Sequence, residues 1–157
     1  MKQLQVVGYK NSGKTTLINE LIKVCHENKM TVSTIKHHGH GIEDISMNHK
    51  EVDSLSFISS GAEESIVLGK QLIERVTKVD KSLQQIIDED LSIEPDILLI
   101  EGFKHEKFPK VLLQNGENGL EHELQNVIYI LNAFDKKENK SFIDWFQNWI
   151  EKEKVNK

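Results

Sequence analysis

The feature that most constrains this chain is an eight-residue segment near its N-terminus, Gly8-Tyr9-Lys10-Asn11-Ser12-Gly13-Lys14-Thr15. It matches the phosphate-binding pattern G-x-x-x-x-G-K-[ST]. The apolar run Leu4-Gln5-Val6-Val7 precedes it, and residues 16–22 continue with helical spacing of apolar side chains. A strand before the loop and a helix after it are the context that the pattern requires. The segment therefore predicts a site for a nucleoside triphosphate.

The residue types in this segment explain the predicted chemistry. Gly8 and Gly13 allow backbone conformations that a side chain would hinder, so that successive N–H groups point toward an anion. The helix that begins near Gly13 directs its positive dipole end to the same place. Lys14 supplies a point charge for the β- and γ-phosphates, and the Thr15 hydroxyl is a ligand for Mg²⁺. The predicted nucleotide-binding residues are Gly8, Lys10, Asn11, Ser12, Gly13, Lys14, Thr15 and Thr16.

Length and composition limit the class of protein. With 157 residues the chain has the size of one ordinary domain, and we expect residues 1–157 to form a single P-loop nucleotide-binding domain. The net charge of -5 argues against non-specific binding to nucleic acid. Cys25 is the single cysteine, and no stretch is apolar enough to span a membrane. We expect a cytoplasmic protein without nucleic-acid or membrane partners.

Hydrophobic periodicity predicts an α/β fold, with a three-layer P-loop architecture in which helices flank a mainly parallel sheet. A β-hairpin around Gly69 is expected as an insertion into that pattern. Asp80 is expected to cap one helix, and Phe57 to face inward on another. We predict strands at residues 4–7, 31–35, 65–68, 72–77, 97–100, 110–114 and 127–131, and helices at 14–28, 49–60, 81–90 and 140–152. Residues 115–123 are expected to be turn-rich.

Glu101 is the predicted second acid of the site. It follows the most apolar run in the chain, Ile97-Leu98-Leu99-Ile100, which is typical of a strand buried on both faces. A P-loop protein places an acid near Mg²⁺, usually at the end of such a strand. Glu101 and Lys14 are therefore the candidate catalytic residues, and Thr15 and Glu101 the candidate metal ligands. The alternative is that Glu101 is simply a polar residue at a strand end.

The segment Lys36-His37-His38-Gly39-His40 follows the second predicted strand, at the sheet edge where α/β proteins hold ligands. Three interpretations stay open: contact with an anionic or heterocyclic ligand, a polar surface loop, or a metal site. Asp44 and Asp53 are further acids that this region could bring to Mg²⁺. The alternative is that both are solvated surface charges.

The end of the last predicted strand gives weak support for guanine as the base. Asn132 and Asp135 have the spacing of the Asn-Lys-x-Asp element that reads guanine in many GTPases, but Ala133 stands where that element has Lys. The choice between GTP and ATP therefore stays open on the residues alone.

Several motifs together resemble the molybdopterin-guanine dinucleotide biosynthesis protein B (MobB) family. Besides the phosphate loop, the matching pieces are Lys36-His37 followed by His40, Asp53-Ser54 followed by Gly61-Ala62, Glu101-Gly102-Phe103-Lys104, and Pro109-Lys110. The chain departs from the family pattern between residues 44 and 60, where the usual Pro-Gly is absent, and at Gly39, which interrupts a double histidine.

The resemblance implies a P-loop adapter that binds GTP with Mg²⁺ and hydrolyses it slowly. Such an adapter is a homodimer and assists the guanylyltransferase that joins GMP to molybdopterin in molybdenum cofactor biosynthesis. A second-ligand or switch loop would include Lys36, His37, His40, Asp53 and Lys104. Two alternatives stay open, a P-loop small-molecule kinase and a nickel-inserting GTPase chaperone. Whether the protein is an enzyme in its own right is likewise open.

Overall fold

A computed structural model describes residues 1–38, 53–116 and 119–151 of the chain. Contacts group the chain into two compact units. The first unit is Met1–Gly39 together with Leu91–Lys157, and the second is His40–Asp90. Among the described residues, none of the helices is long and apolar enough to cross a membrane.

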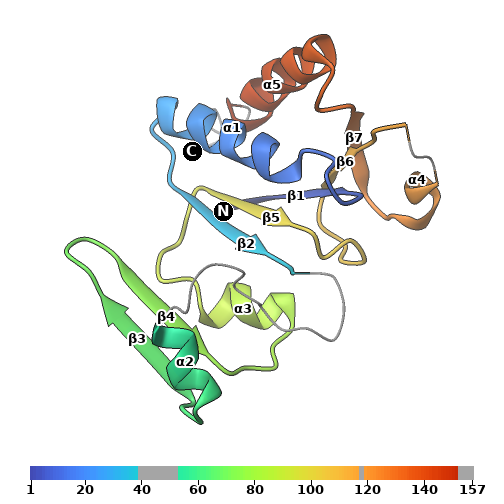
Figure 1. Cartoon of the computed structure of the whole chain (residues 1–157). Coiled ribbons are helices and arrows are strands. Elements are labelled where there is room, and N and C mark those ends of the chain that lie inside the picture. Colours follow the sequence, from blue (N-terminus) through green and yellow to red (C-terminus); the bar gives the residue numbers. More distant parts are fainter. Residues whose placement is uncertain (39–52, 117–118, 152–157) are drawn as a thin grey trace. The chain divides into compact units, whose positions relative to one another are not determined.

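The first unit is built on a five-stranded parallel sheet with the strand order β2-β5-β1-β6-β7 (Figure 1). This architecture confirms the predicted α/β class with a mainly parallel sheet. Because β1 is the middle strand, the loop that follows it opens at the centre of the sheet's carboxyl edge. The strands are β1 (Lys2–Gly8), β2 (Val32–Lys36), β5 (Ile97–Glu101), β6 (Lys110–Leu113) and β7 (Val127–Leu131).

Two long helices, α1 (Lys14–Glu27) and α5 (Lys136–Glu151), pack on one face of this sheet (Figure 1). Their apolar side chains recur at helical spacing and meet the alternate residues of the strands that point to the same face. Each fully buried side chain of this kind contributes roughly 1.5–3 kcal/mol. The buried residues of the two helices are Leu17, Ile18, Leu21, Val24, Cys25, Phe142, Phe146 and Ile150.

The other face of the sheet carries a smaller apolar cluster. Val7 of β1 and Leu112 of β6 pack with Leu120 of the short helix α4 (Leu120–Glu123). This helix lies within the segment that was predicted to be turn-rich.

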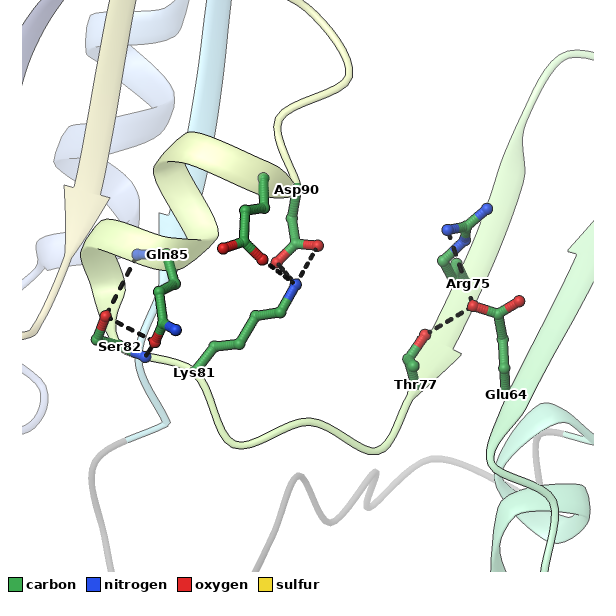
Figure 2. A network of polar contacts seen from close by, with 8 residues as sticks. Glu64, Arg75, Thr77, Lys81, Ser82, Gln85 and Asp90 are labelled. Atoms are coloured by element: carbon green, nitrogen blue, oxygen red, sulfur yellow. Dashed lines mark hydrogen bonds and ion pairs between the residues drawn. The ribbon is translucent and has the colours of Figure 1, made fainter.

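The second unit contains α2 (Asp53–Ser59), the antiparallel hairpin β3 (Glu64–Leu68) and β4 (Ile73–Thr77), and α3 (Leu83–Glu89). The hairpin confirms the predicted insertion, and it forms a two-stranded sheet of its own. Across it, a Glu64 carboxylate oxygen accepts a hydrogen bond of 3.2 Å from Thr77 and lies 3.8 Å from the Arg75 guanidinium (Figure 2).

Three local predictions were wrong. Ser82, not Asp80, caps α3, because its hydroxyl accepts the Gln85 N–H while the Gln85 side chain accepts the Ser82 N–H (Figure 2). Helix α5 begins at Lys136 rather than near residue 140, because the Asp135 carboxylate accepts two N–H groups of its first turn. Phe57 is 56% exposed instead of facing inward.

Candidate nucleotide-binding site

The phosphate loop joins β1 to α1, and its backbone has the conformations that its glycines were predicted to supply. Gly13 has φ 89°, in the left-handed region that favours glycine. At Gly8 glycine is required because the backbone of β6 comes close: a Cβ on Gly8 would lie 2.7 Å from the backbone carbonyl oxygen of Leu113. The central position of β1 therefore presses the loop against its neighbouring strand, and only glycine fits.

Lys14 lies in the first turn of α1 and folds back over the loop. Its ammonium donates to the carbonyl oxygen of Gly8 at 3.1 Å and to that of Tyr9 at 2.6 Å. Partial burial lowers the pKa of Lys14, the Glu101 carboxylate opposes this effect, and Lys36 adds to it. The structure thus places a cation at the mouth of the loop, where a phosphate would replace the two carbonyls as its partner.

Glu101 and Thr15 meet beside the loop. The Thr15 hydroxyl donates to Oε2 of Glu101 at 3.0 Å, and Glu101 is only 7% exposed. The sheet register explains the contact: Glu101 ends β5 opposite Val6 of β1, so it reaches the start of α1. The structure therefore brings together the two residues that the sequence predicted as metal ligands.

Lys36 joins this pair. It is the register partner of Glu101 on the neighbouring strand β2, and its ammonium lies 3.1 Å from Oε1 of Glu101 and 3.3 Å from the Thr15 hydroxyl. The sequence pointed to Lys36 as a residue of a second-ligand loop. The contact between Lys36 and Glu101 could not be predicted without the strand order, which puts β2 beside β5.

These residues fit a magnesium ion. Two hard oxygen donors, the Thr15 hydroxyl and the Glu101 carboxylate, converge next to the phosphate loop, and a cationic side chain already lies against both of them. Mg²⁺ in nucleotide sites is held by one or two protein oxygens together with the phosphates, and Thr15 and Glu101 offer two such protein oxygens here.

Two buried polar side chains support the loop that follows Glu101. Gln5, fully buried on β1, donates to the carbonyl oxygens of Gly102 and Phe103. Its register partner Lys110, fully buried on β6, donates to those of Glu106 and Phe108. Burial lowers the pKa of Lys110. Sequence reasoning missed the role of Gln5, although a polar residue inside an otherwise apolar strand was a visible signal.

The histidine segment is only partly described. The His37 ring packs against Phe103, with 4.7 Å between ring centroids, and this places it beside Gly102. Lys104 is exposed in the loop after β5, whereas Asp53 begins α2 in the second unit. His40 and Asp44 lie outside the described residues. Among the residues that are described, no three His, Cys, Asp or Glu side chains gather as a metal site would need.

The two candidate guanine readers make hydrogen bonds within their own loop. The Asn132 side chain accepts the Phe134 N–H at 3.0 Å. One Asp135 oxygen accepts the N–H groups of Lys137 at 2.8 Å and Glu138 at 3.1 Å. Both side chains therefore stabilise the backbone at the start of α5.

The parallel sheet, the glycine-bounded loop before α1 and the Lys14, Thr15 and Glu101 side chains around it define a P-loop protein of the nucleoside-triphosphate-binding class. The family described as "Molybdopterin guanine dinucleotide synthesis protein B" (MobB) matches residues 3–133. The chain belongs to this family, as its motifs suggested.

Curated relatives carry the corresponding names. A probable molybdopterin-guanine dinucleotide biosynthesis adapter protein of Bacillus subtilis (strain 168) is 35% identical over 87% of this chain and 78% of that protein. The adapter protein of Haemophilus influenzae is 33% identical over 73% of this chain, but the match spans only 64% of its length.

Solved structures agree on the fold. A MobB protein homologue from Bacillus stearothermophilus superposes with a TM-score of 0.73 at 26% identity, and the match covers 97% of this chain and 99% of that one. MobB of Bacillus subtilis superposes with a TM-score of 0.69 at 31% identity, over 83% of this chain and 78% of that one.

Proposed function

We propose that this protein is a GTP-binding adapter that assists the conversion of molybdopterin to molybdopterin guanine dinucleotide. The observation that carries the proposal is the convergence of Lys14, Thr15 and Glu101 at the phosphate loop, in a chain whose family and relatives are named for this pathway. Molybdopterin and the guanylyltransferase that attaches GMP to it are the proposed partners.

In this function the loop amides and Lys14 bind the phosphates, while Thr15 and Glu101 hold Mg²⁺. The ion would supply positive charge that neutralises the phosphates. Gln5 and Lys110 hold the loop that follows Glu101 in place. The Glu101 carboxylate therefore stays aligned with the Thr15 hydroxyl.

Hydrolysis by this site would be slow. Fast GTPases stabilise the transferred phosphoryl group with an arginine. Arg75 is the single arginine of the sequence; it lies on the hairpin of the second unit, where Glu64 is its ion-pair partner. A slow GTPase suits a protein whose bound nucleotide serves as a signal to a partner rather than as a substrate for turnover.

The experiment that tests the proposal is calorimetric titration of the full chain with GTP and with ATP, each with Mg²⁺, before and after addition of molybdopterin. We expect GTP to bind and molybdopterin to strengthen its binding. Lys14→Ala should abolish tight GTP binding, while Lys23→Ala, on the exposed face of the same helix, should leave it unchanged. ATP binding with phosphoryl transfer to a metabolite would instead support the kinase alternative.

We further propose that the protein is a homodimer that uses the β3–β4 hairpin. Its side chains expose an unusual amount of apolar surface: Leu68 and Leu72 are each 80% exposed, and Ile73 is 64% exposed. A two-stranded hairpin with such a surface gains stability from a second copy that covers it. Sedimentation velocity should give a dimer for the wild type and a monomer for the Leu68→Glu/Leu72→Glu double variant.

A further inference from the structure

The ammonium of Lys36 lies where it must lose its present partner when a metal ion binds. It is 3.1 Å from Oε1 of Glu101 and 3.3 Å from the Thr15 hydroxyl. These two side chains are the proposed metal ligands, and Glu101 is buried, with 7% of its surface exposed. A metal ion that takes these oxygens would replace Lys36 as the cation beside Glu101, so Lys36 would need another anion.

The backbone at Lys36 is held in place, whereas its side chain has room to move. Lys36 ends β2 as the register partner of Glu101, and the N–H of the next residue, His37, donates to the Glu101 carbonyl oxygen at 2.9 Å. The His37 ring also packs against Phe103. The Lys36 side chain is 55% exposed, and a lysine carries its ammonium on a flexible stem. The ammonium can therefore change its partner without any movement of the sheet.

The charges of the site favour an anion. Among its described side chains, the ammonium groups of Lys14 and Lys36 face the single carboxylate of Glu101. Lys14 donates to backbone carbonyl oxygens, which carry no full charge. Burial lowers the pKa of Lys14 most, the Glu101 carboxylate opposes this effect, and repulsion from Lys36 lowers the pKa further. An anionic group that both ammonium groups reach would relieve this repulsion.

The position of Lys36 in the sheet indicates which anion this is. In P-loop proteins the loop lysine and the metal ion both act on the β- and γ-phosphates. Lys36 belongs to β2, which lies beyond β5 when the strands are counted from the central strand β1. It therefore approaches the metal ligands from the side away from the loop. From that side it would meet the end of the phosphate chain, which only a triphosphate extends that far.

We propose that Lys36 is the residue by which this protein distinguishes GTP from GDP. Its ammonium pairs with Glu101 in the free protein and with the terminal phosphate in the complex with GTP and Mg²⁺. The proposal rests on the proposed GTP-binding function, which it deepens. It also gives the nucleotide site a cation that responds to the γ-phosphate, although the single arginine of the chain belongs to the second unit.

The first test compares the affinities of the full chain for the non-hydrolysable β,γ-imido analogue of GTP and for GDP, each with Mg²⁺. The wild type should prefer the triphosphate, and Lys36→Met should reduce this preference by about 10-fold or more, as the loss of a charge-assisted hydrogen bond does. The ratio of the two affinities is the useful quantity, because competition between Lys36 and the metal ion affects both nucleotides alike. Lys36→Arg should keep part of the preference, and Lys23→Met, on the exposed face of α1, should keep all of it.

The second test removes the competing carboxylate. In EDTA, where Lys36 of the wild type stays paired with Glu101, Glu101→Gln should prefer the triphosphate more strongly than the wild type does. The Glu101→Gln/Lys36→Met double variant should lose this gain. A lysine that only stabilises the fold would not produce such a dependence of one substitution on the other.

Each contrary outcome has a distinct meaning. A preference for the triphosphate that Lys36→Met leaves unchanged would overturn the proposal, and so would an equal weakening of both nucleotides. If Lys36→Met weakens only the binding of molybdopterin, Lys36 serves the second ligand and the proposal is wrong. A wild type that binds GTP and GDP equally would overturn this inference and leave the nucleotide site standing. A wild type that binds neither nucleotide would contradict the proposed function itself.

Discussion

The ammonium of Lys36 lies 3.1 Å from Oε1 of Glu101, across the register pair that joins the ends of β2 and β5. The same ammonium is 3.3 Å from the Thr15 hydroxyl. A side-chain cation therefore occupies the neighbourhood of both proposed metal ligands, and Mg²⁺ would have to displace it.

The first prediction follows from this competition. Lys36→Met should raise the affinity of the nucleotide-free protein for Mn²⁺, used as a probe for Mg²⁺, by about 2- to 5-fold, the range expected for the loss of a half-exposed ion pair. Titration of free Mn²⁺ by electron paramagnetic resonance measures this. Lys23→Met should have no effect, and Glu101→Gln should weaken Mn²⁺ binding in either background. An unchanged affinity in Lys36→Met would mean that Lys36 does not compete for the site.

The second prediction concerns pH. The pKa of Lys14 is lowered, so in the free protein this ammonium loses its proton at a lower pH than an exposed lysine does. Because the charged form binds phosphate, GTP affinity should fall as the pH rises, and this fall should begin at a pH below the usual lysine pKa of 10.5. In that pH range the binding of GTP should take up a proton. Calorimetry in two buffers of different ionisation enthalpy detects this uptake.

Lys14→Arg is the control for that experiment, because a guanidinium stays charged over this range. The variant should bind GTP more weakly than the wild type does. The ionisation of the nucleotide itself affects the pH profiles of both proteins equally. A wild type whose affinity follows the same pH profile as Lys14→Arg would contradict the assignment to Lys14.

The third prediction tests the buried support of the loop after β5. Gln5→Met leaves the carbonyl oxygens of Gly102 and Phe103 without their donor, at an expected cost of about 1–3 kcal/mol in the free energy of unfolding. Hydrogen exchange of residues 102–108 should accelerate. Gln3→Met, two residues earlier on the same strand and only half-buried, is the matched control. Equal effects of the two substitutions would show that Gln5 has no special role.

The fourth prediction concerns Cys25, which is fully buried on α1. Burial, with a smaller effect of Asp96, raises the pKa of its thiol from 9.0 to about 11. Between these values the unfolded chain ionises and the folded one does not, so the wild type should lose stability relative to Cys25→Ala as the pH rises. Chemical denaturation at pH 8 and pH 10.5 measures the difference, and a constant difference would refute the shift.

The phosphate loop was predictable because its signal is local. The spacing of Gly8 and Gly13, the apolar strand before them and the amphipathic helix after them are properties of neighbouring residues, and backbone geometry follows from them directly. The same is true of the β3–β4 hairpin and of the apolar strand that ends at Glu101. The cap of α3 was missed, although its signal is equally local, because Asp80 and Ser82 are both good cap residues and only the Gln85 partner decides between them.

Tertiary structure decided what lies beside the loop. The order β2-β5-β1-β6-β7 placed Lys36 against Glu101 and Gln5 against Lys110, and it brought Glu20 of α1 to Asn139 of α5, 119 positions away. Strand order depends on which apolar faces and crossovers pack best across the whole sheet, and no window of sequence contains that information. The sequence by itself determined the position and backbone geometry of the phosphate loop; the packing of distant elements decided which side chains surround it.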